Sequence, residues 1–348
     1  MKNNFYLSIA FVTATLTLNA QDIHFSNTEY APLILNPALA GANSGMQANL
    51  AYRTQWGQLG SSFRTANASF DARITQDNTS KSNFLARGVS FFNDRIGDMG
   101  MVTNAAALTI ADHIRLNAQS QLSLGVNAGY SMRSFQNVDG MWASQYDGVA
   151  YDPGIASGED FNNQNFGYFD AGAGLLYTYA KKVKSMARNA DKRVNVGLAA
   201  YHLTRPNNSF VELASERLPV RYTAFANAEI SIDGTNGVVM PGIYAQRQGS
   251  FSQYLFGSYY RYKLNIGSNY TGYQRPFSFA LGLFTRLKDS YIAKLMVDWD
   301  QFSVGYAYDF TVSTLTSNSN RLGASEIFIR FNVGDGGGFR YSGIGKKR

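Results

Sequence analysis

The most constraining feature of this chain is a two-residue alternation of apolar and polar side chains that recurs in long runs. In the stretch 46–56, one parity reads Met, Ala, Leu, Tyr, Thr, Trp and the other reads Gln, Asn, Ala, Arg, Gln. The stretch 121–133 repeats the pattern, and 254–264 carries aromatic residues toward both ends of one parity. A period of two is that of a β-strand with one apolar and one polar face. The chain is therefore predicted to be all-β.

Fourteen such runs can be assigned along the chain. They lie at 46–56, 63–74, 84–94, 102–113, 120–134, 167–179, 193–204, 220–232, 238–248, 252–265, 277–286, 290–298, 301–310 and 324–333. Soluble strands cluster near roughly 5 or 6 residues, whereas a tilted strand needs ~9–11 residues to cross a bilayer. An even number lets the first and last strands pair antiparallel. The sequence predicts a transmembrane antiparallel β-barrel of the outer-membrane type with about 14 strands.

A large soluble β-sandwich is the alternative fold. It does not explain why the second face is so often Gly, Asn, Gln, Ser or Arg along full-length strands, whereas a polar lumen does. Aromatic residues make up 14% of the chain, which also contains 33 Gly. This enrichment also suits a β-protein whose sheet has one face in contact with water. Mean hydropathy is −0.22. No apolar run long enough for a membrane helix follows residue 21, so a helical membrane protein is excluded.

The first twenty residues have the pattern of a secretory signal peptide. Lys2 supplies a positive start, Phe5 to Leu18 is apolar, and cleavage is predicted after Ala20. A membrane anchor is the alternative, but the apolar run is shorter than the ~20 residues such a helix needs. The predicted organisation is a signal peptide (1–20), an N-terminal segment (21–44), a barrel (45–334) and a flexible C-terminal tail (335–348). An exported chain without Cys has no disulfides, so a closed sheet must stabilise it.

The charge balance is basic, with a formal net charge of +7. Export argues against nucleic acid as the partner, which leaves anionic lipid headgroups or another protein. The residues offer no catalytic or cofactor site. His24, His113 and His202 are far apart without metal-ligand spacing, and no Ser, His and Asp arrangement supports a nucleophile. We expect a protein that is not an enzyme and that has no cofactor and no metal site.

One connection, between the fifth and sixth predicted strands, is much longer than the others. With the N-terminus in the periplasm, alternation places this connection outside the cell, where barrel loops are long. Its aromatic and acidic residues are the predicted site for an external partner: Trp142, Tyr146, Tyr151, Asp152, Glu159 and Asp160. There are two alternatives to a partner site. One is a calcium site, although the acidic residues do not follow a calcium-loop spacing, and the other is a solvated loop without a ligand.

The next connection, 180–192, would lie in the periplasm and is strongly basic. Its predicted role is to bind a periplasmic partner through Lys181, Lys182, Lys184 and Arg188. The alternative is a solvated loop beside anionic headgroups.

The segment before the first strand, "LILNPALAGAN" at 33–43, is apolar yet broken by Pro and Gly. Pro cannot join a sheet interior, so the segment is predicted to fold back into the barrel as a lumen plug. The residues expected to form this plug are Leu35, Asn36, Pro37 and Gly41. The polar faces of the first two strands should meet it, with Arg53 and Asp71 neutralising each other. A short periplasmic arm without a packing role is the alternative.

Several segments resemble one known family. The opening "QDIHFSNTEYAPLILNPALAGA" followed by "YRTQW" at Tyr52–Trp56 resembles the start of the PorP/SprF family of Bacteroidetes outer membranes. The segments 201–210, 241–264 and 304–316, and the closing "ASEIFIRFNV", are also similar to family segments. The likeness covers nearly the whole mature chain. One feature departs from the usual insertion signal of outer-membrane barrels, because residues follow the last predicted strand and no aromatic residue ends the chain.

The resemblance implies a role in type IX secretion and gliding motility. Some family members belong to the secretion apparatus and associate with a peptidoglycan-binding lipoprotein. Others pair with secreted adhesins, whose C-terminal domains they help export or hold at the surface. The expected function is therefore export or surface anchoring of a type IX-secreted partner such as a gliding adhesin. The alternatives are a structural component that contacts periplasmic proteins and a passive solute channel.

Overall fold

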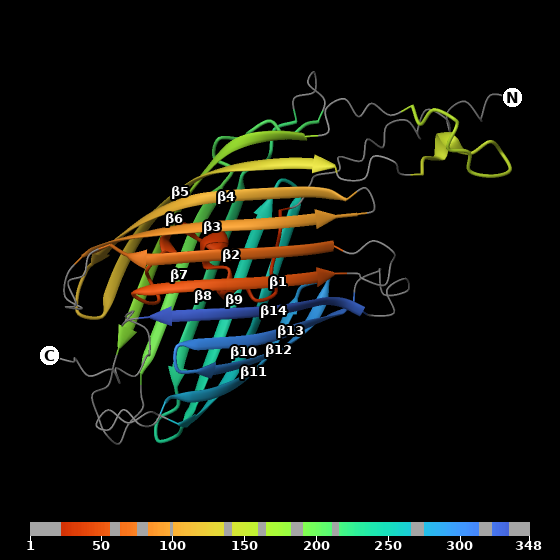
Figure 1. Ribbon diagram of the computed structural model, residues 1–348. Helices are drawn as coiled ribbons and strands as arrows, with labels where there is room; N and C mark the ends of the chain where they lie inside the picture. Colours follow the sequence, from red (N-terminus) through yellow and green to blue (C-terminus); the bar gives the residue numbers. More distant parts are fainter. Residues whose placement is uncertain are drawn as a thin grey trace, which may run out of the picture.

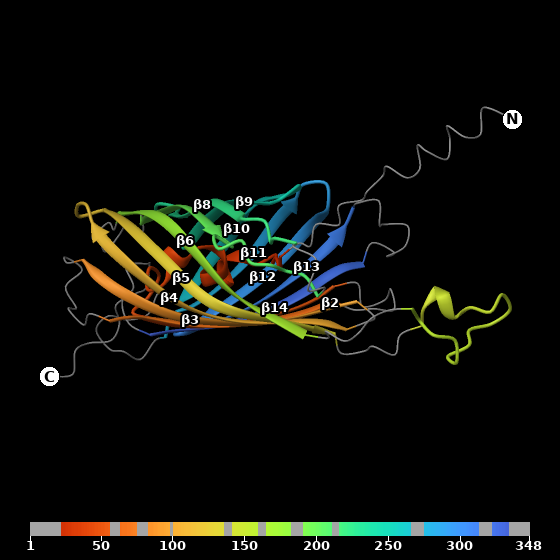
Figure 2. The ribbon, with the colours of Figure 1, turned by 90° about the horizontal axis from the view of Figure 1, so that it is seen from above.

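The computed structural model describes ten stretches of the chain. They are residues 22–55, 63–74, 83–97, 100–135, 141–158, 165–181, 191–210, 216–265, 275–312 and 322–333. Fourteen antiparallel strands form one closed barrel, in which each strand pairs with its sequence neighbours and β1 pairs with β14. Figures 1 and 2 show the strands strongly tilted around a common lumen. The predicted barrel and its strand number are confirmed.

The strands have the following bounds. They are β1 (Met46–Gln55), β2 (Phe63–Arg73), β3 (Phe84–Ile96), β4 (Met101–Arg115), β5 (Ser120–Phe135), β6 (Asn165–Lys181), β7 (Lys192–Tyr201), β8 (Arg221–Ser231), β9 (Gly237–Gln248), β10 (Phe251–Asn265), β11 (Phe277–Arg286), β12 (Ser290–Trp299), β13 (Phe302–Thr311) and β14 (Leu322–Val333). Within the described stretches, four short helical turns accompany them: η1 (Thr28–Tyr30), α2 (Pro32–Leu35), η2 (Pro37–Leu39) and η3 (Ala143–Gln145). None of the helices in the described stretches is long and apolar enough to cross a bilayer.

Every predicted run coincides with one strand, and differences are confined to the ends. The largest difference at one end is in β7, which ends at Tyr201, three residues before the predicted 204, because its register with β8 ends at Tyr201↔Arg221. β6 starts at Asn165 and ends at Lys181, two residues beyond the predicted 167–179 at each end. β6 is longer because its register with β5 continues from Ser120↔Tyr179 to Ser134↔Asn165. Where a strand ends depends on how far it pairs with the neighbouring strands. The alternation of side chains within one strand does not give this length.

The two faces of the wall differ as the alternation predicts. Apolar side chains such as Leu50, Leu108 and Leu283 are exposed on the outer face. The inner face buries polar groups, among them Gln47, Asn49 and Lys294. An apolar exterior around a polar interior is the arrangement of a barrel that has lipid as its surroundings.

The barrel has two unlike ends. β1 begins and β14 ends at one of them, which we call the β1-start end. The connection between β5 and β6 lies at the other, which we call the loop end, and its described part, residues 141–158, extends beyond the strands there (Figures 1 and 2). Exposed aromatic residues are found near both ends of the outer face. Tyr130, Phe169, Tyr222, Tyr254 and Tyr291 lie toward the loop end, and Tyr177, Tyr262, Trp299 and Phe302 lie toward the β1-start end.

Candidate functional site: a chain segment through the lumen

The N-terminal segment, residues 22–44, lies inside the barrel (Figures 1 and 2, red). Asp22 is at the loop end, where its N–H donates to Oε1 of Gln248, the last residue of β9 (3.0 Å). Gly41 is toward the β1-start end, where its N–H donates to Oδ2 of Asp71 in β2 (2.7 Å). The segment therefore crosses the lumen, entering at the loop end and leaving where β1 begins.

The local conformation follows from the two prolines. Pro32 and Pro37 each occupy the first position of a helical turn, where the missing N–H costs nothing. Asn36 lies between the two turns in an extended conformation, and its Oδ1 accepts from the N–H of Ala38 (2.8 Å). Gly41 has φ +67°, a left-handed conformation that favours Gly. The segment is thus kept out of the sheet and turned toward β1.

Asn36 joins the segment to the wall. It is fully buried, and its Nδ2 donates to the carbonyl oxygens of Leu175 in β6 (2.9 Å) and Leu198 in β7 (3.0 Å). Its side chain therefore has partners for both donor and acceptor. The expected partners were polar side chains of the first two strands, and this expectation was wrong. The main chain of the middle strands is accessible because the inner face carries glycines there.

Three glycines form the seat for residues 36–38. A Cβ on Gly125 would lie 2.3 Å from the main-chain nitrogen of Ala38, and one on Gly174 would lie 2.1 Å from Oδ1 of Asn36. A Cβ on Gly197 would lie 2.9 Å from Nδ2 of Asn36. Gly125 and Gly174 are direct cross-strand partners. Any side chain at these positions would overlap the segment.

Apolar residues of the segment build much of the barrel's interior core. Phe25, Tyr30, Leu35 and Leu39 are all buried and belong to one cluster with residues of the wall. The ring of Tyr30 stacks on Phe328 of β14, with centroids 3.4 Å apart. Burying a large side chain of this kind contributes about 1.5–3 kcal/mol. Packing of the segment is therefore a substantial part of the stability of the interior.

Ser26 lies at the centre of a buried charged cluster. Its N–H and that of Asn27 donate to the two oxygens of Glu326 (2.8 and 2.9 Å). Its Oγ lies 2.6 Å from Nη1 of Arg53 and 2.7 Å from Oδ1 of Asp309. Arg53 pairs with Asp309 (3.0 Å) and Glu326 (3.3 Å), so the expected pair of Arg53 with Asp71 was wrong.

Two further cations complete this cluster. Arg286 reaches Asp309 (3.1 Å) and the Oγ of Ser26 (2.8 Å). Lys294 donates to the carbonyl of Ser26 (2.6 Å), lies 3.6 Å from Glu29, and sits over the ring of Phe284. Three basic and three acidic groups are therefore gathered around one turn of the segment. Buried charges need such partners, because the desolvation cost of an unpaired ion is several kcal/mol.

Asp22 fixes the end of the segment at the loop end. Its carboxylate lies 2.5 Å from Nε2 of His202 and 3.3 Å from Arg221, and Nδ1 of His202 lies 2.7 Å from Asp170. Burial opposes the charge of Asp22, but His202 and Arg221 outweigh it and hold the pKa of Asp22 below its usual range. Burial likewise opposes the imidazolium, but Asp22 and then the hydrogen bond with Asp170 raise the pKa of His202 to about 9. We call these four side chains the Asp22 latch.

The other end of the segment is held by main-chain contacts. Nε2 of His113 lies 2.7 Å from the carbonyl of Ala40, and Nε of Arg73 donates to that of Gly41 (2.9 Å). Arg193 donates to the carbonyl of Ala42 (3.2 Å). Carbonyls that the irregular backbone leaves unpaired thus receive side-chain donors.

Each of the fourteen strands contributes a contact to the segment. In order from β1 to β14 the residues are Arg53, Asp71, Gly88, His113, Gly125, Leu175, Leu198, Thr223, Gln248, Tyr259, Arg286, Lys294, Asp309 and Glu326. The residues expected to form a plug, Leu35, Asn36, Pro37 and Gly41, are all buried within this set of contacts. The chain's own N-terminal segment therefore lies in the lumen and contacts the wall on every strand.

The aromatic and acidic residues of the long connection form a separate, compact loop at the loop end. Tyr146 and Tyr151 pair in an isolated bridge, while Asp147 accepts from the N–H groups of Val149 and Ala150. These two bonds lower the pKa of the exposed Asp147. Tyr146, Tyr151 and Asp152 are exposed and Trp142 is half-buried. The structure brings these four together, whereas Glu159 and Asp160 lie outside the described residues.

The basic stretch at the β1-start end is described only in part. Lys181 ends β6 and is exposed, facing its cross-strand partner Lys192. Lys182, Lys184 and Arg188 lie outside the described residues. Within the described part of the chain, no group of three or more His, Cys, Asp or Glu side chains is placed to hold a metal ion.

Residues 17–331 match the model of the type IX secretion system membrane protein PorP/SprF. This chain belongs to the PorP/SprF family. The match covers the lumen segment and nearly all of the barrel, so both are parts of the family's common sequence. The resemblance read from the opening motif is confirmed. A PorP/SprF barrel is a membrane protein of the type IX secretion system, and its fold and family together place it in the outer membrane.

Several solved barrels are similar to this PorP/SprF chain in fold. A mutant of the monoaromatic hydrocarbon channel TodX is 12% identical, with TM-score 0.48, covering 86% of this chain and 92% of that one. The toluene transporter TbuX of Ralstonia pickettii is 10% identical, with TM-score 0.46 and the same coverage. BamA of Haemophilus ducreyi is 8% identical, with TM-score 0.40, covering 83% and 70%. No curated protein matches the chain.

The sequence did not reveal the charged cluster around Ser26 or the Asp22 latch. Ser26 and Glu326 are 300 residues apart, and Asp22 and His202 are 180 apart. The residues of each pair are too far apart in the sequence to form a recognisable motif. The one available signal was the presence of Arg, Lys, Asp and Glu on the polar parity of several strands, which indicates charged groups that need partners in the lumen.

Proposed function

We propose that this PorP/SprF protein is a closed, non-catalytic outer-membrane barrel that exports or anchors a type IX-secreted protein at the cell surface. The partner in this proposal is a surface protein such as a gliding adhesin, bound through its C-terminal domain. One observation carries the proposal: the chain's own residues 22–44 lie in the lumen and contact every strand. A partner must therefore bind to surfaces outside the lumen.

The loop end is the surface that best suits this role. We assign it to the cell exterior, because long connections of outer-membrane barrels are external, and we assign the start of β1 to the periplasm. The loop 141–158 then projects from the cell and presents Tyr146 and Tyr151 as exposed aromatic residues. Tyr, with Trp and Arg, is enriched among the residues that dominate binding to protein partners. In this orientation Asp22 lies toward the exterior opening, although β1 starts in the periplasm.

A structural role in the secretion machinery is the second candidate. It is favoured by the exposed cross-strand pair Lys181 and Lys192 at the proposed periplasmic end. Like charges directly opposite one another destabilise a strand pair, and an acidic partner would offset that repulsion. A peptidoglycan-binding lipoprotein or another machinery component is the proposed partner in this case. A passive solute channel is the least supported role, because the segment occupies the path that solutes would take.

Substitution of the loop aromatics tests the proposal. Trp142→Ala, Tyr146→Ala and Tyr151→Ala would be combined and compared with Leu203→Ala, which removes an exposed apolar side chain from the connection between β7 and β8. The amount of type IX-secreted protein on intact cells would be measured, together with the proteins that copurify with the barrel. We expect the triple variant to lose surface partner while the barrel level is unchanged.

The same experiment separates the candidates. Unchanged surface partner in the triple variant would overturn binding through this loop. If Lys181→Glu with Lys192→Glu removes a periplasmic protein from the purified barrel while surface partner persists, the machinery role is the correct one. A large, steady conductance of the wild-type protein in planar bilayers would contradict a closed barrel.

A further inference from the structure

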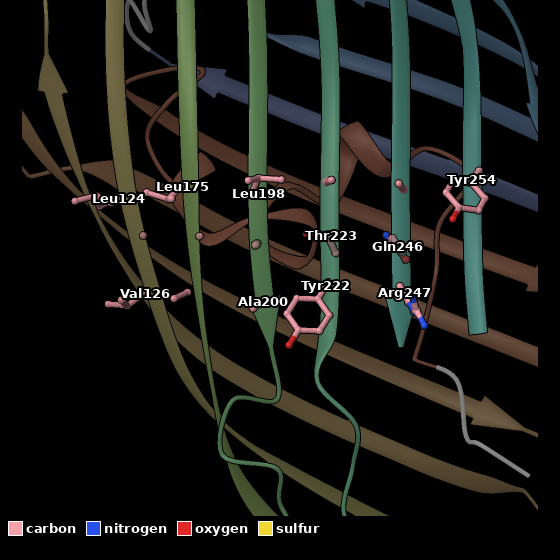
Figure 3. A pocket seen from close by; sticks show the side chains of 16 residues that line it. Leu124, Val126, Leu175, Leu198, Ala200, Tyr222, Thr223, Gln246, Arg247 and Tyr254 are labelled. Carbon is pink, nitrogen blue, oxygen red and sulfur yellow. The ribbon is translucent and has the colours of Figure 1, made fainter. Parts of the chain in front are cut away.

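The outer wall of the barrel contains a groove across β5 to β10. Its volume is about 690 Å³. Figure 3 shows Leu124, Leu175 and Leu198 along one side of it and Ala200, Tyr222 and Arg247 along the other. The groove exists because outward positions on four adjacent strands are Ala: Ala173, Ala200, Ala224 and Ala245. Their registers adjoin, with Ala173 opposite Ala200 and Ala224 opposite Ala245.

The inner face of the same wall is already occupied. Gly125 and Gly174, which also line the groove, carry no side chain because residues 36–38 press against them from the lumen. Small residues therefore lie on both faces of one patch. Contact with the lumen segment explains the glycines on the inner face. It does not explain the alanines on the outer face. On a lipid-facing wall, an apolar hollow of this kind is filled by an acyl chain or by another protein.

The chemistry of the rim favours a lipid with an anionic headgroup. Arg247 and Tyr222 are cross-strand partners at the loop end of the groove, and Tyr254 lies opposite Ala245. In the described part of the chain Arg247 has no carboxylate partner. Tyr is the side chain typical of the interface between acyl chains and headgroups, and Arg binds phosphate through its planar fork of donors. The groove thus has an apolar floor and one cation at headgroup level.

We propose that this groove holds a phosphorylated lipid of the leaflet at the loop end. An acyl chain lies over the alanine floor between Leu198 and Tyr222, and a headgroup phosphate binds Arg247. The proposal does not depend on which secreted protein the barrel binds. Only the identity of the leaflet depends on the orientation of the barrel. It is the outer leaflet when the loop end faces the exterior.

The molecule contains a natural control. A second outward hollow, of about 370 Å³, lies over β1 to β3 and β14. Its floor includes Ala66 and Ala68, and Tyr52 is among its lining residues, but it has no basic residue. If Arg247 recognises a phosphate, only the first groove should distinguish a phosphorylated lipid from one without phosphate.

Native mass spectrometry of the purified full-length barrel tests the proposal. The probes are bisphosphorylated lipid A and the same lipid without its phosphates. Arg247→Gln should reduce retention of the phosphorylated probe about fivefold, since one basic residue near an anionic surface contributes about 1 kcal/mol. Ala200→Leu with Ala224→Leu, which fills the floor, should remove the preference for the phosphorylated probe. Arg95→Gln replaces an exposed Arg near the end of β3 at the same end of the barrel, and Ala66→Leu with Ala68→Leu fills the second hollow; both should leave that preference unchanged.

Two results would overturn the proposal. One is equal loss of lipid in Arg247→Gln and Arg95→Gln, which would indicate a general effect of charge. The other is a copurifying protein that displaces both probes and is itself lost when the alanine floor is filled, which would make the groove a protein interface. All of these substitutions lie on the outer face, so the contacts of the lumen segment are preserved and folding can be checked by heat-modifiable migration.

Discussion

Asn36 donates to the main-chain carbonyl of Leu175 at 2.9 Å, which joins the lumen segment to the middle of the sheet. Replacement by Ala removes this bond and the one to Leu198, and it leaves the N–H of Ala38 without its acceptor. A buried group without a partner costs about 1–3 kcal/mol. We expect Asn36→Ala to lower the free energy of unfolding by that amount, measured by denaturant titration in micelles. A variant as stable as wild type would show that water replaces the amide.

The glycine seat leads to a packing prediction. In Gly174→Ala the new methyl group would overlap Oδ1 of Asn36, which the surrounding bonds prevent from moving. We expect a loss of about 1–3 kcal/mol, the usual cost of overpacking. Gly167→Ala in the same strand is the control, because the atoms nearest its methyl group belong to the phenol end of Tyr130, an exposed side chain on the outer face that can turn away. Equal effects of the two substitutions would indicate a change in strand propensity instead of a clash.

The buried charges give the largest expected effect. Glu326→Gln removes one acceptor of Arg53 and weakens the bonds from the N–H groups of Ser26 and Asn27. Removing one partner of a buried ion pair costs about 3–5 kcal/mol. Asp300→Asn makes the same chemical change at the exposed pair with Arg275 and should cost less than ~1 kcal/mol. Thermal unfolding of both variants in detergent would measure the difference.

The fold was predictable because alternation is local. The alternation within a single strand shows which of its side chains face lipid. A strand such as 46–56 or 254–264 can therefore be recognised without knowing which strands it pairs with. The position of the lumen segment was predictable only in outline. Pro32, Pro37 and Gly41 exclude it from a strand, and its apolar residues require burial. Its partners depend on three-dimensional proximity, which explains why Asn36 was assigned to the first two strands and lies instead on β6 and β7.

The charged cluster shows the same limit. Arg53 and Asp71 lie on adjacent strands and on the same face, which made them an attractive pair. In the structure Asp71 accepts from the N–H of Gly41, and Arg53 turns toward Asp309 and Glu326. Closure between β1 and β14 brings those two carboxylates near Arg53. The sequence alone does not give the register with which the barrel closes, so it does not show that these two carboxylates lie near Arg53.

The Asp22 latch should make stability depend on pH. The pKa of His202 is raised to about 9 in the folded protein, compared with ~6.5 in an unfolded chain. The stabilisation is therefore fully present below about pH 6.5 and is lost as pH rises through about 9. Asp22, whose pKa is lowered, contributes above about pH 4 and loses its contribution as pH falls below that value.

His202→Asn tests this pH dependence, since Asn tolerates the φ of +59° at that position. We expect the difference in unfolding free energy between wild type and variant to be largest between about pH 4 and 6.5 and to shrink toward pH 10. Denaturant titrations at several pH values would measure it. A difference that stays constant up to pH 10 would show that His202 contributes by packing and not by charge.

The proposed orientation can be tested with single cysteines, since the chain has none of its own. Val149 is 87% exposed in the loop at the loop end, and Ala118 is exposed in the turn between β4 and β5 at the opposite end. We expect Val149→Cys to react with a membrane-impermeant thiol reagent on intact cells, and Ala118→Cys to react only after lysis. The reverse pattern would place the loop 141–158 in the periplasm and would exclude it as an adhesin site.

Deletion of residues 33–41 tests whether the segment closes the lumen. The deletion removes Leu33, Leu35 and Leu39 from the interior and takes Asn36 away from its glycine seat, so a water-filled path should connect the two ends. The Ser26 cluster and the Asp22 latch lie outside the deleted residues, and the strands that pair with one another are unchanged. We therefore expect the barrel to assemble, with a higher single-channel conductance and greater sensitivity of cells to bulky antibiotics.

Deletion of the exposed loop residues 146–152 is the matched control and should leave conductance low. Failure of the deleted barrel to assemble, with normal assembly of the loop control, would mean that the segment is required for folding. An assembled barrel with unchanged conductance would show that other residues close the lumen.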